Sequence, residues 1–461
     1  MALSISGQGP RGRGRLVLVA VVLVVAGLAL AGALRRGPAP AVVITSDHEA
    51  IGPATTITAH FSEPTGGLGA VKLELVQGER SVVLAERRFA RSGPFSLLRG
   101  RVTAETDLTG TAGRKAQEWL KEGEAVVRAT ADRMAGPLRS GAPVVVEKRM
   151  AVLLRPPRLE LLSRQHYVRQ GGSGVVVFRV GEGVARSGVR AGATESLSFP
   201  LPGGGPGERF ALFAVPWELD DVGQVRLFAE DAAGNRSELP FVDLFKKAPP
   251  RTDTIDLSDD FLARVVPAIA SQTPGFDASG SLLDQYLRIN GEERRAVLAK
   301  IAALAKDTQA AFLWRGAFLQ MPDTQRRAGF AETRTYLYHG KAVDHQTHLG
   351  LDLASTEHAP VPAANSGRVV FAGWLVIYGN AVIVDHGYGL MSLYGHMSAI
   401  SVKPGDVVAK GQQLGNSGST GLAGGDHLHL EIFVQGKSVN PLEWLDEHWI
   451  RDNIANKIKL P

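Results

Sequence analysis

Hydrophobic and polar positions alternate along the chain from residue 42 to about residue 247. Short runs of Val, Leu and Phe alternate with polar residues and are interrupted by Gly and Pro, which is typical of half-buried strands joined by turns. The pattern predicts two β-sandwich domains, at residues 40–155 and 156–248, that follow a linker at residues 37–41.

An internal repeat supports this pair of domains. The segment 119–136 aligns without gaps with the segment 217–234, and Trp119 matches Trp217. A repeat of about 100 residues has the size of an immunoglobulin-like sandwich, so we expect two Ig-like domains. The sequence of these domains shows no cluster of aromatic or charged residues, which favours a spacer over a ligand-binding module.

Helical periodicity replaces the alternation at residues 255–325, after a predicted linker at residues 246–254. Ser258 is a candidate N-cap that is followed by two acidic residues, and a second helix is expected to begin at Ser281. Apolar residues recur three to four positions apart over residues 291–312. These helices could pack on the next domain, cover its cleft or bind a partner, and packing is the default expectation.

Strand signals return after Gly329 and predict a compact, mostly antiparallel domain over residues 326–448. With its short helical segment, the whole chain is predicted to be a mainly β, multidomain protein. The expected strands of the last domain are GRVVFAGW (367–374), NAVIVDHG (380–387), LMSLYGHM (390–397) and HLHLEIFV (427–434).

An uncharged apolar run at residues 16–34 follows a short, basic N-terminal tail, residues 1–15. At about 1.5 Å per residue, a helix of this length nearly spans a hydrocarbon core of about 30 Å. We therefore predict a transmembrane anchor, with everything after residue 36 on the outer side. A cleaved signal peptide is the alternative, because Ala31-Gly32-Ala33 resembles a cleavage site.

The composition limits the classes of partner and the kinds of metal site that the chain can have. The net charge of +5 is spread along the chain without a dense basic run, which argues against a nucleic-acid partner. The chain has no cysteine, so disulfides, thiolate metal sites and cysteine nucleophiles are excluded. Any metal site must use histidines and carboxylates.

Histidines and one carboxylate gather in two short motifs of the last domain. Side chains alternate between the faces of a strand, so His427, His429 and Glu431 share one face of the run HLHLE. The motif HLGLD adds His348 and Asp352. A catalytic zinc ion takes three nitrogen or oxygen ligands and keeps one open position. His348, Asp352 and one of the two paired histidines would supply that set.

Four separated stretches in this order resemble the M23 family of zinc metallopeptidases, the lysostaphin/LytM-type peptidoglycan endopeptidases. The resemblance covers residues 329–444, about a quarter of the chain. The matching stretches are THLGLDLAS (347–355), VPAANSGRVVFAGW (361–374), the run from Tyr378 to Gly421, and HLHLEIFVQGKSVNPLEW (427–444).

The resemblance implies one zinc ion per chain, bound by His348, Asp352 and His429. His396 and His427 would be the catalytic pair: His427 would orient or deprotonate the attacking water, and His396 would help to stabilise the oxyanion. Which of the two acts as the base stays open. The family has Gly where this chain has Ala331, a departure at the rim of the groove.

The implied protein is a membrane-anchored endopeptidase that cleaves the peptide cross-links of peptidoglycan on the periplasmic side of a bacterial inner membrane. Its expected partners are peptidoglycan stem peptides, the inner membrane through the N-terminal helix, and an envelope protein that could bind the Ig-like or helical region. Family members that lost their ligands act as activators, so a non-catalytic scaffold or activator of another hydrolase is the alternative. This chain keeps all five positions, which favours activity.

The remaining histidines of this region have no counterpart at family positions and are expected at the surface or the rim of the cleft. Asp385 is expected to be a turn residue. These histidines are His339, His345, His358, His386 and His448.

Overall fold

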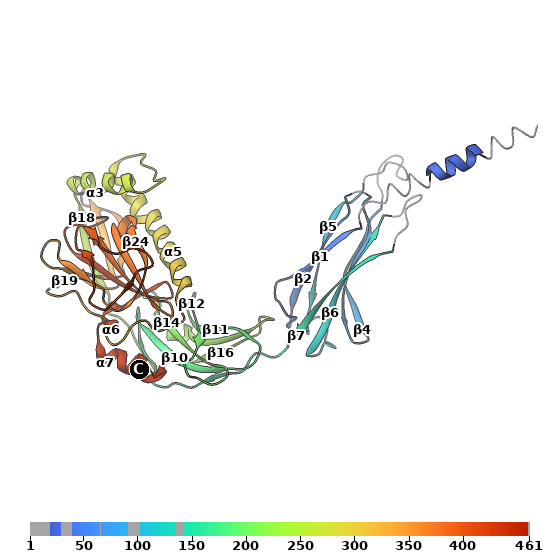
Figure 1. Ribbon diagram of the computed structural model, residues 1–461, viewed down its shortest axis with the longest axis horizontal. Helices are drawn as coiled ribbons and strands as arrows, with labels where there is room; N and C mark the ends of the chain where they lie inside the picture. Colours follow the sequence, from blue (N-terminus) through green and yellow to red (C-terminus); the bar gives the residue numbers. More distant parts are fainter. Residues whose placement is uncertain (1–18, 29–38, 65, 91–101, 135–141, 460–461) are drawn as a thin grey trace, which may run out of the picture. The chain divides into compact units, whose positions relative to one another are not determined.

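The chain forms two compact units, one of residues 1–156 with 231–235 and the other of residues 157–230 with 236–461 (Figure 1). The computed structural model describes residues 19–28, 39–64, 66–90, 102–134 and 142–459.

The predicted N-terminal tail, residues 1–15, lies outside the described residues, and so does part of the predicted anchor, residues 16–34. Residues 19–28 are helical, and their apolar side chains are exposed. Among the residues that the structure describes, no helix has the length and apolar character needed to cross a membrane. The anchor therefore stays a prediction.

The first unit is built from two antiparallel sheets with the strand orders β1-β2-β5 and β4-β3-β6-β7. Side chains from both sheets, such as Phe61 and Leu73, are fully buried in one shared core, as expected for two sheets packed face to face. The strands are β1 (Ala41–Ser46), β2 (Thr55–Ser62), β3 (Leu68–Gln77), β4 (Arg80–Arg88), β5 (Glu105–Ala112), β6 (Gly123–Arg133) and β7 (Val144–Val152).

A second β domain opens the other unit. It has two four-stranded sheets, β13-β14-β10-β8 and β12-β11-β15-β16, around a core that includes Phe178 and Leu227. Strands β9 and β17 pair in parallel as a separate ribbon. The strands are β8 (Leu159–Leu161), β9 (Tyr167–Arg169), β10 (Ser173–Val180), β11 (Val184–Ala191), β12 (Thr194–Leu197), β13 (Phe199–Pro200), β14 (Glu208–Ala214), β15 (Val225–Asp231), β16 (Arg236–Pro240) and β17 (Leu244–Lys246).

The two segments of the internal repeat occupy equivalent strands. Val127 lies in β6 and its counterpart Val225 lies in β15. Each of these strands is the third in a four-stranded sheet, and each pairs with the strand that follows it in the chain. The equivalence is one of topology, and the immunoglobulin-like classification stays a prediction.

The helical segment begins where capping predicted it. The Ser258 side chain accepts a hydrogen bond from the Phe261 amide at 3.1 Å, and Ser281 forms a capping box with Asp284. The predicted linker at residues 246–254 is shorter in the structure, because its last residues belong to strand β18. The elements are β18 (Arg251–Leu257), α3 (Asp259–Gln272), α4 (Leu282–Arg288), a π-helical turn (Ile289–Glu293), α5 (Arg294–Leu304) and a 3-10 turn (Ala305–Asp307).

The last domain is organised around one large antiparallel sheet with the order β19-β22-β30-β26-β25-β24-β28. Two three-stranded sheets, β18-β20-β21 and β23-β29-β27, flank it. The strands are β19 (Gln325–Ala328), β20 (Glu332–Tyr338), β21 (Lys341–His348), β22 (Leu351–Ala354), β23 (Pro360–Pro362), β24 (Gly367–Trp374), β25 (Asn380–Gly387), β26 (Leu390–Met397), β27 (Ala399–Ile400), β28 (Val407–Val408), β29 (Gln413–Asn416), β30 (Leu428–Val434) and β31 (Lys437–Val439), and the C-terminal helices are α6 (Pro441–Trp444), α7 (Glu447–Ile450), a π-helical turn (Arg451–Ala455) and α8 (Asn456–Ile458).

Both faces of this large sheet are covered. On one face, Leu430 of β30 belongs to a core that also contains Phe210 of the second β domain and Trp444. On the other face, Phe433 belongs to a core that also contains Ile301 of α5. Strand β30 is consequently buried along its whole length. The second β domain, the helices and the last domain form one packed body.

A buried glutamate joins the second β domain to helix α6. Glu443 accepts hydrogen bonds from the amide of Ser173 at 2.9 Å and from its hydroxyl at 3.3 Å. The Ser173 hydroxyl in turn accepts a bond from the Trp444 indole at 3.1 Å. Burial raises the pKa of Glu443 to about 7, although the hydrogen bonds from Ser173 and the charge of Arg169 oppose this shift.

We expect Glu443 to make the second unit less stable as the pH rises. The pKa of the folded state lies above the ordinary value of 4.5, so the penalty is absent below pH 4.5, grows between pH 4.5 and 7, and is complete above that range. Its size is about 3 kcal/mol. Glu443→Gln should raise the Tm at pH 8 and leave it nearly unchanged at pH 4. Equal pH profiles of the Tm for the two proteins would contradict this account.

Candidate metal centre

Three strands bring His348, Asp352 and His429 together. His348 ends β21, and Asp352 in β22 lies directly opposite His429 in the antiparallel β22–β30 pair. The motif between the first two residues needs its glycine, because a Cβ atom on Gly350 would lie 2.6 Å from the His429 ring. The close approach of these strands therefore depends on the sequence HLGLD.

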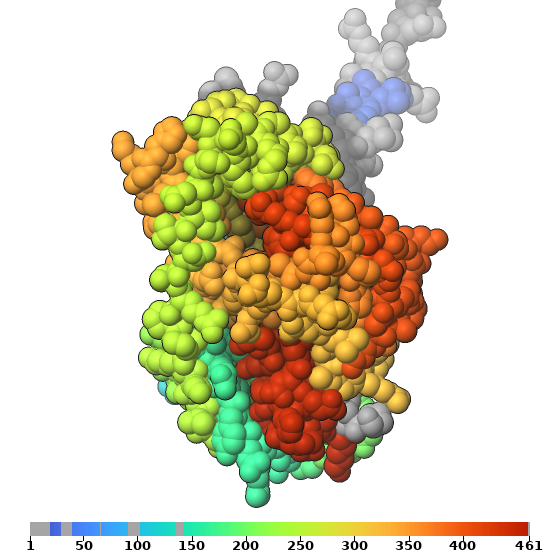
Figure 2. Space-filling view, turned by 90° about the vertical axis from the view of Figure 1, so that its left-hand side faces the viewer, coloured from blue at the N-terminus to red at the C-terminus, as the bar shows by residue number. Residues whose placement is uncertain are grey.

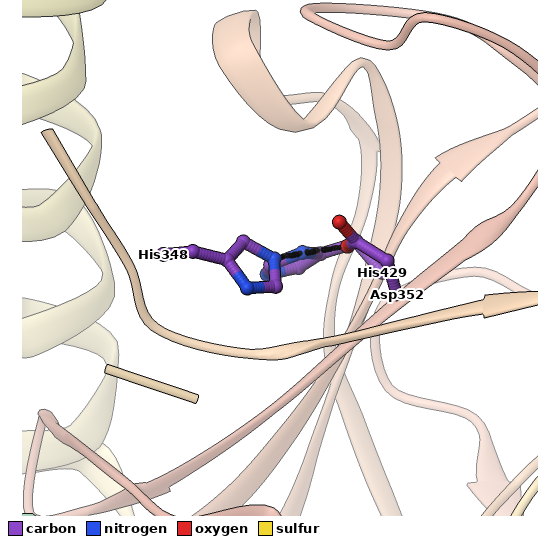
Figure 3. A group of neighbouring side chains, drawn as sticks. All are labelled: His348, Asp352 and His429. Carbon is purple, nitrogen blue, oxygen red and sulfur yellow. Dashed lines mark hydrogen bonds and ion pairs between the residues drawn. The ribbon is translucent and has the colours of Figure 1, made fainter. Parts of the chain in front are cut away.

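The three side chains converge on one point (Figure 3). His348 Nε2 lies 2.9 Å from Asp352 Oδ1, His429 Nδ1 lies 3.0 Å from the same oxygen, and the two ring nitrogens are 3.1 Å apart. These three groups are buried, and within the described residues they form the one histidine and carboxylate cluster close enough to hold a metal ion.

Outer hydrogen bonds orient both rings. His348 Nδ1–H donates to the Gly329 carbonyl at 2.8 Å, so its Nε2 is free to face the cluster. His429 Nε2 lies 3.3 Å from Glu431 Oε2, which leaves Nδ1 to face the cluster. Glu431 is fully buried and also accepts hydrogen bonds from Tyr378, at 2.7 Å, and from Ser438. Partners of this kind fix the tautomer of a metal ligand.

The donor set fits a small divalent cation. Ligands of tetrahedral zinc at about 2.05 Å from the ion are separated from one another by about 3.3 Å. This separation is close to the three distances in the cluster.

The charged groups around the cluster act on its protonation. The second oxygen of Asp352 lies 3.2 Å from Arg334 Nη2. Burial lowers the pKa of His429, but Asp352 and Glu431 outweigh this effect and raise it to about 9. The cluster thus stabilises positive charge.

Two further histidines face the same cavity. His396 Nδ1–H donates to the Thr420 carbonyl at 2.7 Å, and His427 Nδ1–H donates to the Gly425 carbonyl at 2.8 Å. Their ring centroids are 4.7 Å apart, and His427 Nε2 lies 3.5 Å from Asp352 Oδ1. Each ring can therefore use its Nε2 atom as a proton acceptor.

The backbone of His396 has φ +62°, a left-handed conformation that is uncommon for a residue with a side chain. Burial, together with the nearby His427 and His429, lowers the pKa of His396 well below its usual value. The ring is consequently neutral near pH 7.

The helical segment forms part of the cavity wall. The cavity has a volume of about 200 Å³ and is lined by all five site residues, by Arg334 and by Tyr378. Phe261 of α3 and Tyr286 of α4 line it as well. Figure 2 shows the yellow-green helical segment above the orange and red strands of the last domain.

Sequence reasoning named the five histidine and aspartate positions, and the structure places all of them around this cavity. It gave no role to Arg334, Glu431 or Tyr378. The period-two pattern of β30 already placed Glu431 on the face of the histidines, which was a usable signal. Arg334 and Tyr378 reach the site through tertiary contacts and had no such signal.

Four of the other histidines lie at exposed positions: His339, His345, His358 and His448. The prediction for His386 is wrong, because its ring is fully buried and bonds to the Ser366 carbonyl and the Ser392 hydroxyl, each at 2.7 Å. The prediction for Asp385 is wrong too, since it is a buried residue of β25. The reason is the same for both: β25 is an inner strand covered on both faces.

A buried cluster of two histidines and an aspartate, on an antiparallel sheet with two further histidines beside it, is the kind of site found in metal-dependent hydrolases. Residues 346–441 match the sequence profile of Peptidase family M23. This part of the chain is a peptidase M23 domain.

Similar proteins carry this domain in different settings. The murein hydrolase activator EnvC of Escherichia coli is 43% identical over 96 residues, which cover 21% of this chain and 23% of EnvC. The DD-carboxypeptidase/endopeptidase Mpg of Neisseria meningitidis is 42% identical over 95 residues, 21% of this chain and 22% of Mpg. The peptidoglycan DD-endopeptidase ShyA of Vibrio cholerae is 41% identical over 96 residues, 21% of this chain and 22% of ShyA. The matches thus span less than a quarter of these relatives.

We expect Glu431→Gln to weaken metal binding about 10- to 100-fold, because the variant loses the carboxylate that orients His429. The measurement is competition for Zn²⁺ with a chromogenic chelator. His358→Ala, which removes an exposed histidine outside the cluster, is the control and should bind as the wild type does. A Glu431 variant with unchanged affinity would remove this residue from the metal centre.

Proposed function

We propose that the chain is a zinc-dependent endopeptidase that cleaves peptide cross-links of peptidoglycan. The observation that carries the proposal is the complete set of five side chains around one cavity. Three converge closely enough to hold a metal ion, and two histidines beside them donate Nδ1–H to backbone carbonyls. The M23 domain and the names of Mpg and ShyA support the substrate class.

Zinc would be held by His348 Nε2, Asp352 Oδ1 and His429 Nδ1. In that position the ion supplies Lewis acidity, which polarises a carbonyl and makes water a nucleophile near neutral pH. His427, whose Nε2 lies close to Asp352, takes the proton of the attacking water. His427 then delivers this proton to the nitrogen of the leaving amine. His396, whose ring centroid lies 4.7 Å from that of His427, assists beside the developing oxyanion.

The alternative function is activation of another cell-wall hydrolase without catalysis. EnvC, a murein hydrolase activator, is the specific observation that favours it. The intact donor set favours the enzyme, because an activator has no use for two oriented metal-binding histidines and a buried carboxylate.

A location in the cell envelope completes the proposal. The uncharged run at residues 16–34 would anchor the chain in the inner membrane, and the M23 domain would then work on the periplasmic side. Peptidoglycan is the substrate available there.

Substitutions at two histidines should separate metal binding from catalysis. His348→Ala should lose both bound zinc and the release of soluble muropeptides from purified sacculi. His427→Ala should keep about one zinc ion per chain but lower cleavage at least about 100-fold, because general acid–base catalysis contributes roughly 10²- to 10⁴-fold. Metal analysis and mass spectrometry of the digests are the measurements.

His358→Ala is the matched control for these variants and should cleave as the wild type does. A wild-type protein that binds zinc, releases no muropeptides and stimulates a second hydrolase would instead establish the activator. Equal cleavage by wild type and His427→Ala would exclude the assigned role of His427.

The helices restrict the cleft in this proposal. Removing the helices would expose Phe433 and Leu393 of the large sheet to water. A shortened chain that begins near residue 326 is therefore a poor test of whether the helices restrict the cleft. Phe261 is better suited, because it lines the cavity and is only partly buried.

We expect Phe261→Ala to raise kcat/KM for a soluble cross-linked muropeptide a few-fold, because the smaller side chain widens the cavity. Phe276→Ala is the control: Phe276 is also a partly buried residue of the helical segment, but it does not line the cavity. Both rates can be followed by chromatography of the products. If the two variants change the rate equally, Phe261 does not restrict access.

A further inference from the structure

Two cavities of about 430 and 660 Å³ lie side by side where the second β domain meets the last domain. They have Arg169 and Lys246 in common, so they are adjacent, and together they are here called the junction groove. None of the five residues of the metal centre lines it. In the lower half of Figure 2, the turquoise stretch of the second β domain lies beside the red C-terminal helices.

The ribbon of β9 and β17 forms the floor of this groove. In its parallel register, Tyr167 lies opposite Leu244 and Arg169 lies opposite Lys246. All four side chains are exposed, whereas Val168 between them is buried. Like charges directly opposite each other destabilise a strand pair. The ribbon nevertheless presents two cations, Arg169 and Lys246, together with Tyr167 and Leu244 on one exposed face.

Among the described residues, the cations of the groove form no close ion pair, although the charge of Arg169 acts on Glu443 and that of Asp243 acts on Lys457. Arg164, Lys247, Arg251 and Lys457 line it in addition to the ribbon pair. None of the six forms an ion pair or a side-chain hydrogen bond with any residue that the structure describes. Of the acidic residues in the walls, Glu218 and Asp220 are exposed, and Asp452 is paired with Arg451 at 2.9 Å. The groove is thus lined by more cations than acidic residues, six against three.

Aromatic side chains lie between these cations. Trp217 and Phe330 line the first cavity, and Tyr167 and Trp449 line the second. Tyr167 is 52% exposed. Trp217 and Trp449 are half-buried, and Phe330 is buried. Aromatic rings beside cations suit a ligand that has both apolar ring faces and carboxylates.

The groove leads to the metal centre along strand β18. Arg251 at the start of this strand lines the groove, and Ile255 and Leu257 line the metal cavity. Ile255 lies four positions after Arg251 in the strand, a distance of about 13 Å. Phe330 and Ala331 of the groove follow Gly329, whose carbonyl orients His348.

We propose that the junction groove binds a peptidoglycan strand, with its cations on the stem-peptide carboxylates and its aromatic rings on the sugars, and so holds the polymer next to the metal cavity. The proposal deepens the proposed function and rests on its substrate class. It assigns substrate binding to the second β domain, outside the M23 segment.

The test measures binding separately from cleavage. The full chain carrying His427→Ala is sedimented with purified sacculi, and its apparent Kd is compared with that of the same chain carrying Arg169→Gln and Lys246→Gln. The control pair is Lys403→Gln and Lys437→Gln, two exposed lysines outside the groove. Thermal unfolding verifies that each protein is folded. Tyr167→Ala is an independent variant that tests the aromatic residues of the groove.

The groove pair should weaken sacculus binding about tenfold or more, Tyr167→Ala should weaken it several-fold, and the control pair should change it less than twofold. Equal binding by the groove and control pairs would overturn the proposal. Loss of binding to phosphatidylglycerol vesicles, with sacculus binding intact, would assign the groove to a lipid surface and overturn it as well. Because the binding assay uses an inactive variant, its outcome is independent of whether the chain cleaves peptidoglycan.

Discussion

The burial of one strand on both faces is the constraint on which the site depends. Every residue of β30 is buried, and two of them, His429 and Glu431, are polar. A buried polar or charged group costs several kcal/mol unless it is hydrogen-bonded. His429 and Glu431 bond to each other, and Tyr378 and Ser438 complete the partners of Glu431. This requirement fixes the His429 ring and aims its Nδ1 at Asp352.

The burial of β30 on both faces requires elements that cover the large sheet on each side. The second β domain and the tryptophans near the C-terminus exclude water from one face, and helices α3 to α5 exclude it from the other. The low polarity around the cluster strengthens each electrostatic contact within it. It also lowers the pKa of His348 by burial, so the ring stays neutral and able to bind a metal. The added domains therefore contribute to the chemistry of the site.

The second β domain has two surfaces with different roles. Its inner side chains, such as Phe210, share a core with the last domain, which fixes its position in the unit. Its outer ribbon displays Arg169 and Lys246 directly opposite each other. A folded protein retains such a like-charge pair at some cost in stability. A domain expected to be a spacer thus shares a core with the domain that carries the metal centre.

Much of this molecule could be predicted from local sequence. Period-two alternation predicts the strands, and Ser258 and Ser281 mark helix starts, because both signals act between residues a few positions apart. The spacing within HLGLD and HLHLE brings the right donor types to two strands. Local sequence could not show that β25 is covered on both faces, so it predicts His386 at the surface or the rim of the cleft and Asp385 in a turn. Local sequence also could not show that the Arg334 side chain contacts Asp352, or that cations from distant segments line the same groove. The burial of β25 and these contacts depend on which surfaces pack together and exclude water. Only the packing of segments that are distant in the sequence decides which surfaces these are.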